Sequence, residues 1–589
     1  MIYYDQAIAT ADRELSVRRA RNRAFIISEI VTFLLAVLSI VLFTTGTGDG
    51  LMMALAVLFI ALYIYIRFTD TRNDKVIRQF EDIRSACIRE RNYLNGKYDD
   101  FDDGRRYADA NHPFTTDLDI FGRESLYQRV CRAVTTGGAD ALAEAFKLTD
   151  GPHDERHEAI AELAKKPELL IEFKRWGQRG VANTTAVRKA FNNIQTLKLP
   201  SWARSNVVKV ISWIYLAVFI CALLYSIATQ TNLLSMVWWC IINFFAVYII
   251  CNKNMKAITD AVGGLVKQHG VYVQLVAIVE QTETQETVLA NLRNQVAGAS
   301  ESLKTLDGIL QRLESRGNIL GLFIFDMLFL WDYQILNSFN RWQKRYASHF
   351  DQWIAAVSQF DMLVSMATFR YNESDLTTDA EIIDSDKVEY EAKGLFHPFL
   401  GKKAVRNDFT ITDRNFYIIT GANMAGKSTF LRSLGINYVL AMNGMPVFAS
   451  KLTVSRFHLF TSMRTTDDLT RGISYFNAEL LRLQQILDSL RDDSPTLIIL
   501  DEILKGTNSE DKLSGSRMFL EYVAKKNVTG VIATHDLKLS SMVEAYAERF
   551  HNYCFEIALG TDVTYSYKIT PGVARNQNAT FLLKKMLEK

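Results

Sequence analysis

The sequence has little cysteine, and its six cysteines are spread along the chain. They are Cys87, Cys131, Cys221, Cys240, Cys251 and Cys554. There is no C-x-x-C pair and no Cys/His cluster, so the pattern gives no support to a disulfide framework or a thiolate metal site. We therefore expect the cysteines to pack as small apolar side chains in a protein of a reducing compartment.

The sequence also lacks a net charge of one sign. Its 67 Lys and Arg residues nearly balance its 65 Asp and Glu residues. The overall charge therefore does not indicate a nucleic-acid partner, and a nucleic-acid site would have to be a local basic face. With 589 residues, the chain is long enough for about three or four domains.

Charged residues are missing altogether from four long apolar stretches. These are Ile30–Gly48, Leu51–Ile66, Val210–Ile227 and Leu233–Ile250. A helix of about 18–20 residues spans roughly 27–30 Å, which is the thickness of the hydrocarbon layer of a membrane. Because only short connections separate the stretches within each pair, we predict two transmembrane helical hairpins.

The alternative to membrane hairpins is two pairs of buried helices in a soluble protein. Soluble helices usually keep a polar stripe, whereas Ile241–Ile250 offers only Asn243. Lys and Arg flank the outer ends of both hairpins and are missing from both tips. By the positive-inside rule, both termini are expected in the cytoplasm of a multi-pass protein of the bacterial inner membrane, in contact with the lipid bilayer.

The remaining sequence falls into helical and mixed regions. Residues 254–313 follow a helical pattern and predict either one long arm or two helices, with a simple helical bundle as the alternative. Ile319–Thr368 is rich in aromatic residues, for which core packing is favoured over base stacking. From about Ile382, short apolar strands alternate with helices, as in an α/β domain.

A phosphate-binding loop lies in this α/β region. Gly421 to Ser428 matches the spacing G-x-x-x-x-G-K-[ST], between a predicted strand at 416–420 and a predicted helix at 430–440. Strand, loop and helix in that order bring backbone N–H groups to phosphate oxygens. The residues expected to bind ATP are Gly421, Asn423, Met424, Gly426, Lys427, Ser428 and Thr429. Lys427 would contact the β- and γ-phosphates, and Ser428 would bind Mg²⁺.

Two later strands carry the remaining hydrolytic groups. Residues 496–502 form an apolar strand that ends in Asp501 and Glu502. We expect Asp501 to hold Mg²⁺ together with Ser428, and Glu502 to polarise the attacking water. A third strand, at 531–534, ends at His535, which would sit close to the γ-phosphate.

A possible signature helix precedes the strand of Asp501. Gly472–Glu479 opens a helix at Ser474, which would present N–H groups to an anion. In ABC-type dimers such a helix completes the partner's ATP site, and the alternative is an ordinary helix cap. The similar Leu513-Ser514-Gly515 follows the strand of Asp501 instead of preceding it, so it does not fit this role.

Together these motifs resemble the MutS family of mismatch-repair ATPases. The family's loop G-P-N-M-G-G-K-S-T appears here as G-A-N-M-A-G-K-S-T at 421–429, and D-E-I-G-R-G-T appears as D-E-I-L-K-G-T at 501–507. The family's A-T-H corresponds to Ala533–His535. The resemblance further implies that His397 and Pro398 begin the adenine-side loop, and that the family's core region opens near residue 117.

Three departures from the family pattern stand out. The first 115 residues contain predicted membrane helices and no Phe-x-Glu mismatch wedge, a predicted hairpin interrupts the core region, and Leu504 replaces a glycine. The resemblance therefore implies the family's ATP chemistry more strongly than its DNA binding. It implies mismatch recognition least.

The expected fold is multidomain: transmembrane helical hairpins, an all-α core and lever region, and a C-terminal α/β P-loop domain. The expected segments are 1–23 (cytoplasmic), 24–67 (first hairpin), 68–206 (helical), 207–251 (second hairpin), 252–381 (lever and core) and 382–589 (cytoplasmic ATPase domain). The expected function is that of a membrane-anchored, homodimeric ATPase that uses ATP and Mg²⁺ to bind mismatched or branched DNA. The alternative is an ATPase that acts on a protein or lipid partner, and four spans without a transporter signature disfavour an exporter.

Overall fold

The computed structural model describes residues 2–46, 50–229, 233–263, 265–316, 326, 330–464, 475–559 and 563–575. The chain divides into two compact units. The first unit comprises Met1–Lys97, Ala133–Ala139 and Glu168–Met362 and is helical. The second comprises Tyr98–Arg132, Asp140–Pro167 and Leu363–Lys589 and contains both β-sheets.

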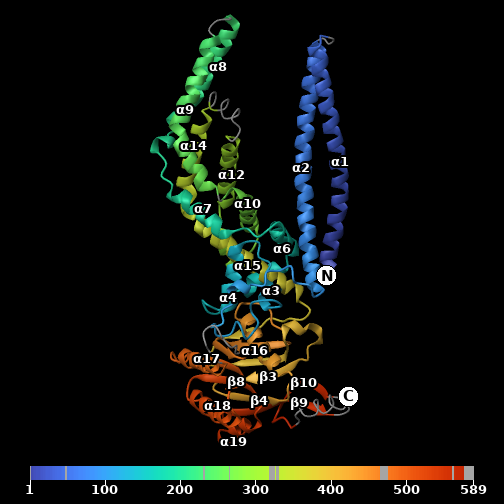
Figure 1. Cartoon of the computed structure of the whole chain (residues 1–589), viewed down its shortest axis with the longest axis vertical. Coiled ribbons are helices and arrows are strands. Elements are labelled where there is room, and N and C mark those ends of the chain that lie inside the picture. The colour runs from blue at the N-terminus through green and yellow to red at the C-terminus, as the bar shows by residue number, and fades with distance from the viewer. Residues whose placement is uncertain are drawn as a thin grey trace. The chain divides into compact units, whose positions relative to one another are not determined.

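Two long antiparallel helices, α1 (Ile2–Thr44) and α2 (Gly50–Leu94), open the first unit (Figure 1). Their polar halves pair like a coiled coil, because the residues that α1 buries there recur every three or four positions. These residues are Tyr4, Ile8, Ala11 and Leu15. The expected segment ends at residues 23 and 67 therefore lie inside continuous helices, and the hairpin extends well beyond its apolar part.

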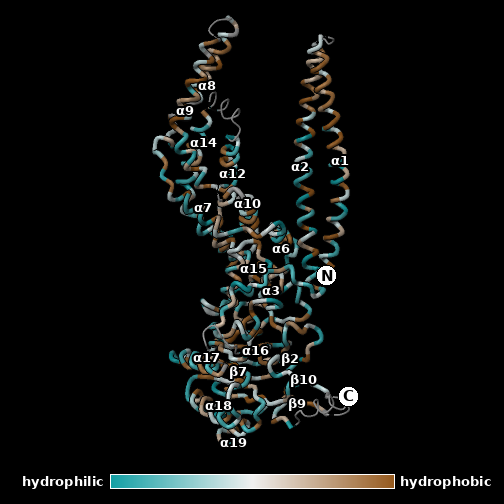
Figure 2. Tube along the Cα trace, in the orientation of Figure 1, coloured by the Kyte–Doolittle hydropathy of each residue, from teal (hydrophilic) through white to brown (hydrophobic). Residues whose placement is uncertain are grey.

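The apolar halves of α1 and α2 are exposed. Within the described residues, these two helices are long and apolar enough to cross a membrane, judged by length and composition, and only 17% and 6% of their apolar windows are buried. Figure 2 shows the hydrophobic residues concentrated at the end of the hairpin away from the N-terminus. A soluble core helix would bury such a surface.

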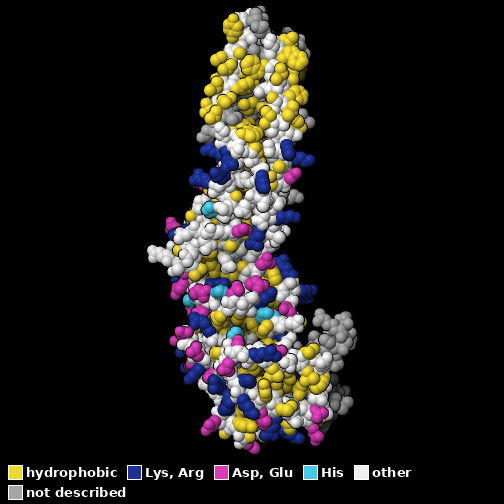
Figure 3. All heavy atoms as spheres, turned by 90° about the vertical axis from the view of Figure 1, so that its left-hand side faces the viewer, with side chains coloured by type: hydrophobic (Ala, Val, Ile, Leu, Met, Phe, Trp, Pro, Cys, Tyr) yellow, Lys and Arg dark blue, Asp and Glu magenta, His cyan; other side chains and the backbone are white. Residues whose placement is uncertain are grey.

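The second predicted hairpin forms the helices α8 (Asn206–Thr229) and α9 (Leu233–Val262). Its exposed apolar side chains gather over these helices in Figure 3. Only part of this pair has described side chains, and within that part lies the apolar stretch Trp213–Ser226 in α8. The two helices of the first pair meet the criteria for a span, and the second predicted pair stays a prediction.

Helices form the rest of the first unit. The run at 254–313 is neither a single arm nor a helix pair. As in the alternative prediction of a bundle, it contains several packed helices, namely the end of α9 and three further helices. These are α10 (Val266–Gln281), α11 (Thr287–Gln295) and α12 (Ala299–Ser315). Next come α14 (Trp331–Tyr346) and α15 (Phe350–Asn372). Their aromatic residues Phe339, Trp342 and Phe350 are buried, which confirms the prediction of core packing.

Shorter helices lie between α2 and α8 in the chain and belong to both units. They are α3 (Leu126–Val130), α4 (Thr136–Lys147), α5 (His157–Ala164), α6 (Pro167–Lys174) and α7 (Thr184–Thr196).

Two sheets form the framework of the second unit. A four-stranded sheet has the order β1-β5-β2-β3, with β1 (Glu381–Ile383), β2 (Tyr390–Leu395), β3 (Asn407–Ile411) and β5 (Lys451–Ser455). A six-stranded sheet has the order β10-β9-β4-β8-β7-β6. Its strands are β4 (Phe416–Gly421), β6 (His458–Ser462), β7 (Thr496–Asp501), β8 (Val528–Thr534), β9 (Phe550–Leu559) and β10 (Val563–Pro571).

The sequence predicted the inner strands of the six-stranded sheet because they are almost continuously apolar, as strands buried on both faces must be. The accompanying helices are α16 (Lys427–Ala441), α17 (Tyr475–Ser489), α18 (Ser509–Val523) and α19 (Met542–Ala545). The parallel register pairs Thr420 with Thr534 and Asp501 with Ala533. The carboxyl ends of β4, β7 and β8 therefore meet at one edge of the sheet.

Candidate nucleotide site

The predicted phosphate loop connects β4 to α16 at this edge. Gly426 has a φ of 109°, and a Cβ atom there would lie 3.2 Å from Cδ1 of Tyr567, so only glycine suits the position. No described side chain caps the helix that begins at Lys427. Its first N–H groups can therefore bind an anion such as a phosphate.

Lys427 is buried beneath this loop. Its Nζ donates hydrogen bonds to the carbonyl oxygens of Gly421 (2.8 Å) and Ala422 (2.9 Å). Burial lowers the pKa of Lys427 to about 8, although the nearby carboxylates of Asp501 and Glu502 favour its charged form. A buried ammonium at a phosphate-binding loop is well suited to a phosphate.

Ser428 and Asp501 bring two oxygen ligands together. The Ser428 hydroxyl donates to Oδ2 of Asp501 over 2.5 Å. A hydroxyl beside a carboxylate is the pair of protein ligands that Mg²⁺ accepts while it keeps most of its ligands as water and phosphate. The residues therefore fit the ion that the sequence predicted for them.

Glu502 follows Asp501 with a left-handed backbone, at a φ of 62°. Its N–H donates to the carbonyl oxygen of Ala533 (2.8 Å), which ties it to β8. Its Oε2 lies 3.4 Å from Nζ of Lys512 on α18. Backbone strain of this kind costs about 1–3 kcal/mol and persists where the surroundings enforce it.

His535 follows β8 and faces Lys427. Its Nε2 lies 3.3 Å from Nζ of Lys427. Partial desolvation and then the Lys427 ammonium lower the pKa of His535, so the imidazole is neutral at pH 7. A neutral imidazole beside an ammonium presents a lone pair to it and keeps an N–H for another group.

A cavity of about 470 Å³ adjoins the loop. Its walls include Asn423, Met424, Thr429, His397, Phe555 and Tyr567. His397 lines the cavity and also caps the short helix Pro398–Lys403, since its Nδ1 accepts from the N–H of Phe399 (3.3 Å). Burial lowers the pKa of His397 to about 4.

Phe555 and Tyr567 were not predicted from the sequence as part of this site. Both come from the last hairpin, β9 and β10, and a register shift in β10 between Tyr565 and Ile569 includes Tyr567. A bulge of this kind leaves no motif, so no sequence signal identifies the ring as part of the cavity wall.

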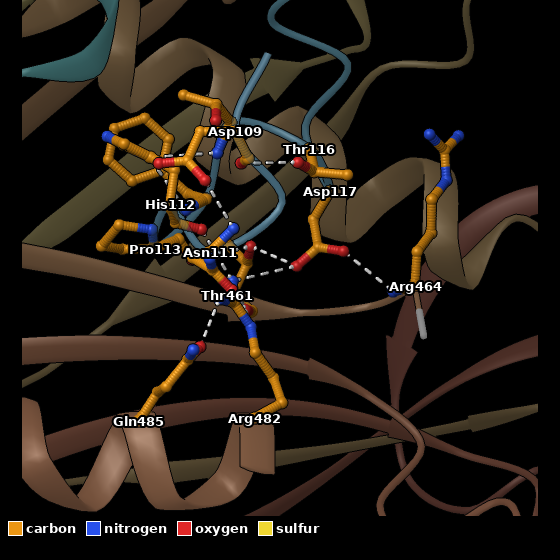
Figure 4. A network of polar contacts seen from close by, with 12 residues as sticks. Asp109, Asn111, His112, Pro113, Thr116, Asp117, Thr461, Arg464, Arg482 and Gln485 are labelled. Carbon is orange, nitrogen blue, oxygen red and sulfur yellow. Dashed lines mark hydrogen bonds and ion pairs between the residues drawn. The ribbon is translucent and has the colours of Figure 1, made fainter. Parts of the chain in front are cut away.

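The predicted helix start at Ser474 lies outside the described residues, but both sides of that segment are described. Before it, the Arg464 N–H donates to Oδ1 of Asp117 (2.8 Å), and after it Arg482 lies 3.7 Å from Oδ2 of the same carboxylate. Figure 4 shows Asp117 between Thr461, Arg464 and Arg482. From the sequence, Asp117 was expected only at the opening of the core region, without these contacts.

The comparisons with known proteins agree with these motifs. Residues 417–582 match the model of MutS domain V. The DNA mismatch repair protein MutS of Acetivibrio thermocellus is 33% identical over 232 residues, which cover 38% of this chain and 26% of that protein. MutS of Methanococcoides burtonii is 32% identical over 38% of this chain and 26% of its own length. Human MutS protein homolog 4 is 30% identical over 38% of this chain and 24% of its own length.

The matches cover only about a quarter of the length of these relatives. The match to MutS domain V nevertheless includes the whole phosphate-binding loop and the ends of the two later strands, β7 and β8. Residues 417–582 of this chain are therefore a domain of the MutS family.

Proposed function

We propose that this protein hydrolyses ATP at the edge where β4, β7 and β8 end. The convergence of Lys427, Ser428, Asp501 and His535 at this edge carries the proposal. These side chains come from three separate parts of the sequence, and each belongs to a motif of a nucleotide-hydrolysing site. The MutS-family domain supports a role like that of mismatch-repair ATPases.

Each residue has a distinct task in this reaction. The N–H groups at the start of α16 and the Lys427 ammonium bind the phosphates of ATP. Ser428 and Asp501 would hold Mg²⁺, which neutralises phosphate charge when it is bound. Glu502 accepts a proton from the attacking water, while the neutral His535 orients groups near the γ-phosphate.

We further propose that two copies associate through their ATP sites. The segment with Ser474 would reach the partner's nucleotide, as the signature helix does in ABC-type dimers. Closure of this dimer on ATP would move the helical units like a clamp.

The membrane anchor is part of the same proposal. The apolar halves of α1 and α2, and the exposed surface of α8 and α9, support a multi-pass protein of the bacterial inner membrane with the ATP site in the cytoplasm. Exposed apolar surfaces of this extent are stable in a lipid bilayer and not in water.

The proposed ligand is mismatched or branched DNA, and ATP is proposed to control its binding. The proposal rests on the names of the relatives, which are mismatch repair proteins. The second candidate is an ATPase that acts on a protein or lipid partner, and the exposed hairpin helices favour it.

Glu502→Gln tests the hydrolytic assignment in the detergent-solubilised protein. The amide cannot accept the proton, so the variant should bind ATP, keep it unhydrolysed and accumulate the closed dimer. Bound nucleotide is extracted and separated into ATP and ADP, and the dimer is measured by light scattering. Glu521→Gln, which changes a half-buried glutamate on α18, is the matched control. Wild-type turnover by Glu502→Gln would refute the role of Glu502.

A further inference from the structure

Helix α18 is fitted against the segment that carries Glu502. Nζ of Lys512 lies 3.4 Å from Oε2 of Glu502, and Oγ of Ser516 donates to the carbonyl oxygen of Ile503 (3.3 Å). Between these two, a Cβ atom on Gly515 would lie 2.5 Å from Cδ1 of Leu504. Positions 512, 515 and 516 share one helix face. That face therefore contacts three consecutive residues after Asp501.

Both partners of the ion pair have fixed backbones. On one side, Glu502 and Leu504 adopt left-handed conformations (φ of 62° and 57°), and the Glu502 N–H is bonded to β8. On the other side, the Asn508 side chain caps α18 by accepting from the N–H of Asp511 (2.9 Å). The Lys512 N–H donates to the carbonyl oxygen of Asn508 (2.9 Å) in the first turn. These contacts fix the backbone on both sides of the ion pair and so restrict where the Lys512 ammonium can lie.

The pair is largely shielded from water. The side chains of Lys512 and Glu502 are 19% and 15% exposed. A shielded pair holds its geometry better than a surface pair, in which water and mobile side chains weaken the attraction. Among the described residues, Lys512 is the ion-pair partner of Glu502.

Lys512 does not line the nucleotide cavity, although its charge contributes a minor part of the lowered pKa of His535, which does. The cavity wall includes Lys427 and Lys403, whereas Lys512 is not among its described residues. A change at Lys512 should therefore leave the affinity for nucleotide largely intact and alter what Glu502 does.

We propose that Lys512 is a positioning residue for the hydrolytic step: its ammonium holds the Glu502 carboxylate where it meets the attacking water. The inference rests on the proposed function and deepens it. In that step the water oxygen forms a bond to the γ-phosphorus, the bond from the γ-phosphorus to the bridging oxygen breaks, and Glu502 takes the water proton. ADP and phosphate are the products, and the proton then leaves Glu502.

The test replaces Lys512 by Met in the full-length, detergent-solubilised protein, because Met keeps the apolar stem and removes the charge. The kcat for ATP should fall about 10- to 100-fold, as expected when a catalytic group is displaced by about 1 Å. The Kd of a non-hydrolysable fluorescent ATP analogue should change by less than about twofold, and bound nucleotide should be mainly ATP. Lys512→Arg should restore most of kcat. Arg517→Met, a cation on the same helix, is the matched control.

A double-mutant cycle shows whether Lys512 acts through Glu502. In the Glu502→Gln background, Lys512→Met should lower the residual rate by less than about twofold. An equal fold-loss in both backgrounds, an unchanged or raised kcat in the single variant, or a Kd that weakens as much as kcat would each overturn the inference. Wild-type protein without ATPase activity would overturn the proposed function as well, whereas an active wild type with any of these outcomes overturns the positioning role alone.

Discussion

Two histidines near the cavity have lowered pKa values for different reasons. Burial dominates at His397, which is 8% exposed, with a smaller contribution from the Arg432 guanidinium. At His535, desolvation is joined by the ammonium of Lys427 only 3.3 Å away. Both imidazoles are neutral at pH 7, but His397 serves mainly the fold as a helix cap, while His535 faces the phosphate site.

His397→Asn should make the stability of the protein less sensitive to acid. The pKa of His397 in the folded protein is about 4, below the ordinary value of 6.5. Between these two values the unfolded chain binds a proton at His397 and the folded chain does not. By pH 5 this costs the wild type about 2 kcal/mol of unfolding free energy. Asn still caps the helix and does not titrate.

Urea titrations of the nucleotide-free protein at pH 7 and pH 5 measure this difference. His349→Asn, an exposed histidine, is the control. Equal losses of stability between pH 7 and pH 5 in the wild type and His397→Asn would contradict the assignment.

Among the secondary-structure elements, α17 is tied to the segment before α3 by one arginine. Arg482 donates to the carbonyl oxygens of Pro113 (2.7 Å) and Thr461 (2.9 Å) and lies 3.7 Å from the Asp117 carboxylate. The Thr461 hydroxyl also donates to Asp117 (2.7 Å), so β6, α17 and this segment meet at one buried carboxylate (Figure 4). This contact ties α17, the helix that follows the predicted signature segment, to the chain before α3.

Arg482→Leu should destabilise the second unit by about 3–5 kcal/mol, since it leaves the Asp117 carboxylate buried without its cation. Arg482→Leu combined with Asp117→Leu should recover part of the loss, because the unpaired charge is then gone. Urea unfolding followed by tryptophan fluorescence measures both variants, with the exposed Arg491→Leu as the control. A loss below about 1 kcal/mol in the single variant would show that the pair is dispensable.

The contrast between these elements explains how much the sequence could predict. The strands β4, β7 and β8 were predictable because each is a short apolar run that ends in a motif, and the motifs have fixed spacing. The contact of Arg482 with Asp117 joins distant parts of the chain. The resemblance marks Asp117 as the opening of the core region but gives it no partner, and Arg482 belongs to no motif. The pairing of Lys512 with Glu502 depends on which face α18 turns toward the preceding loop. Such contacts follow from tertiary packing, which periodicity does not report.

For the first hairpin, both polar ends of α1 and α2 should lie on the cytoplasmic side, and the tip at Thr45 and Gly46 on the other. In a variant without the natural cysteines, Thr45→Cys should react with a membrane-impermeant maleimide in intact bacterial spheroplasts. Ser16→Cys should react only after lysis. Labelling is read by the gel shift of the modified protein. Reaction of both positions before lysis, or of neither after it, would argue against a membrane hairpin at α1 and α2.

At the scale of the whole molecule, the prediction concerns the ligand whose binding ATP controls. If DNA is the ligand, the solubilised protein should bind mismatched or four-way-junction DNA more tightly than a matched duplex, and ATP should change that affinity. Because phosphate contacts release counterions, the affinity should also fall steeply between about 50 and 200 mM salt. Fluorescence anisotropy with labelled DNA measures each of these properties.

Lys427→Ala is the control for this experiment, since it should lose the ATP effect and keep nucleotide-free DNA binding. The near balance of 67 basic and 65 acidic residues means that any DNA site must be a local surface, so binding should saturate at a defined stoichiometry. If no ATP-sensitive binding occurs even at 50 mM salt, DNA is not the ligand. ATP-driven closure of the dimer would then act through the apolar helices, on a protein or lipid partner at the membrane.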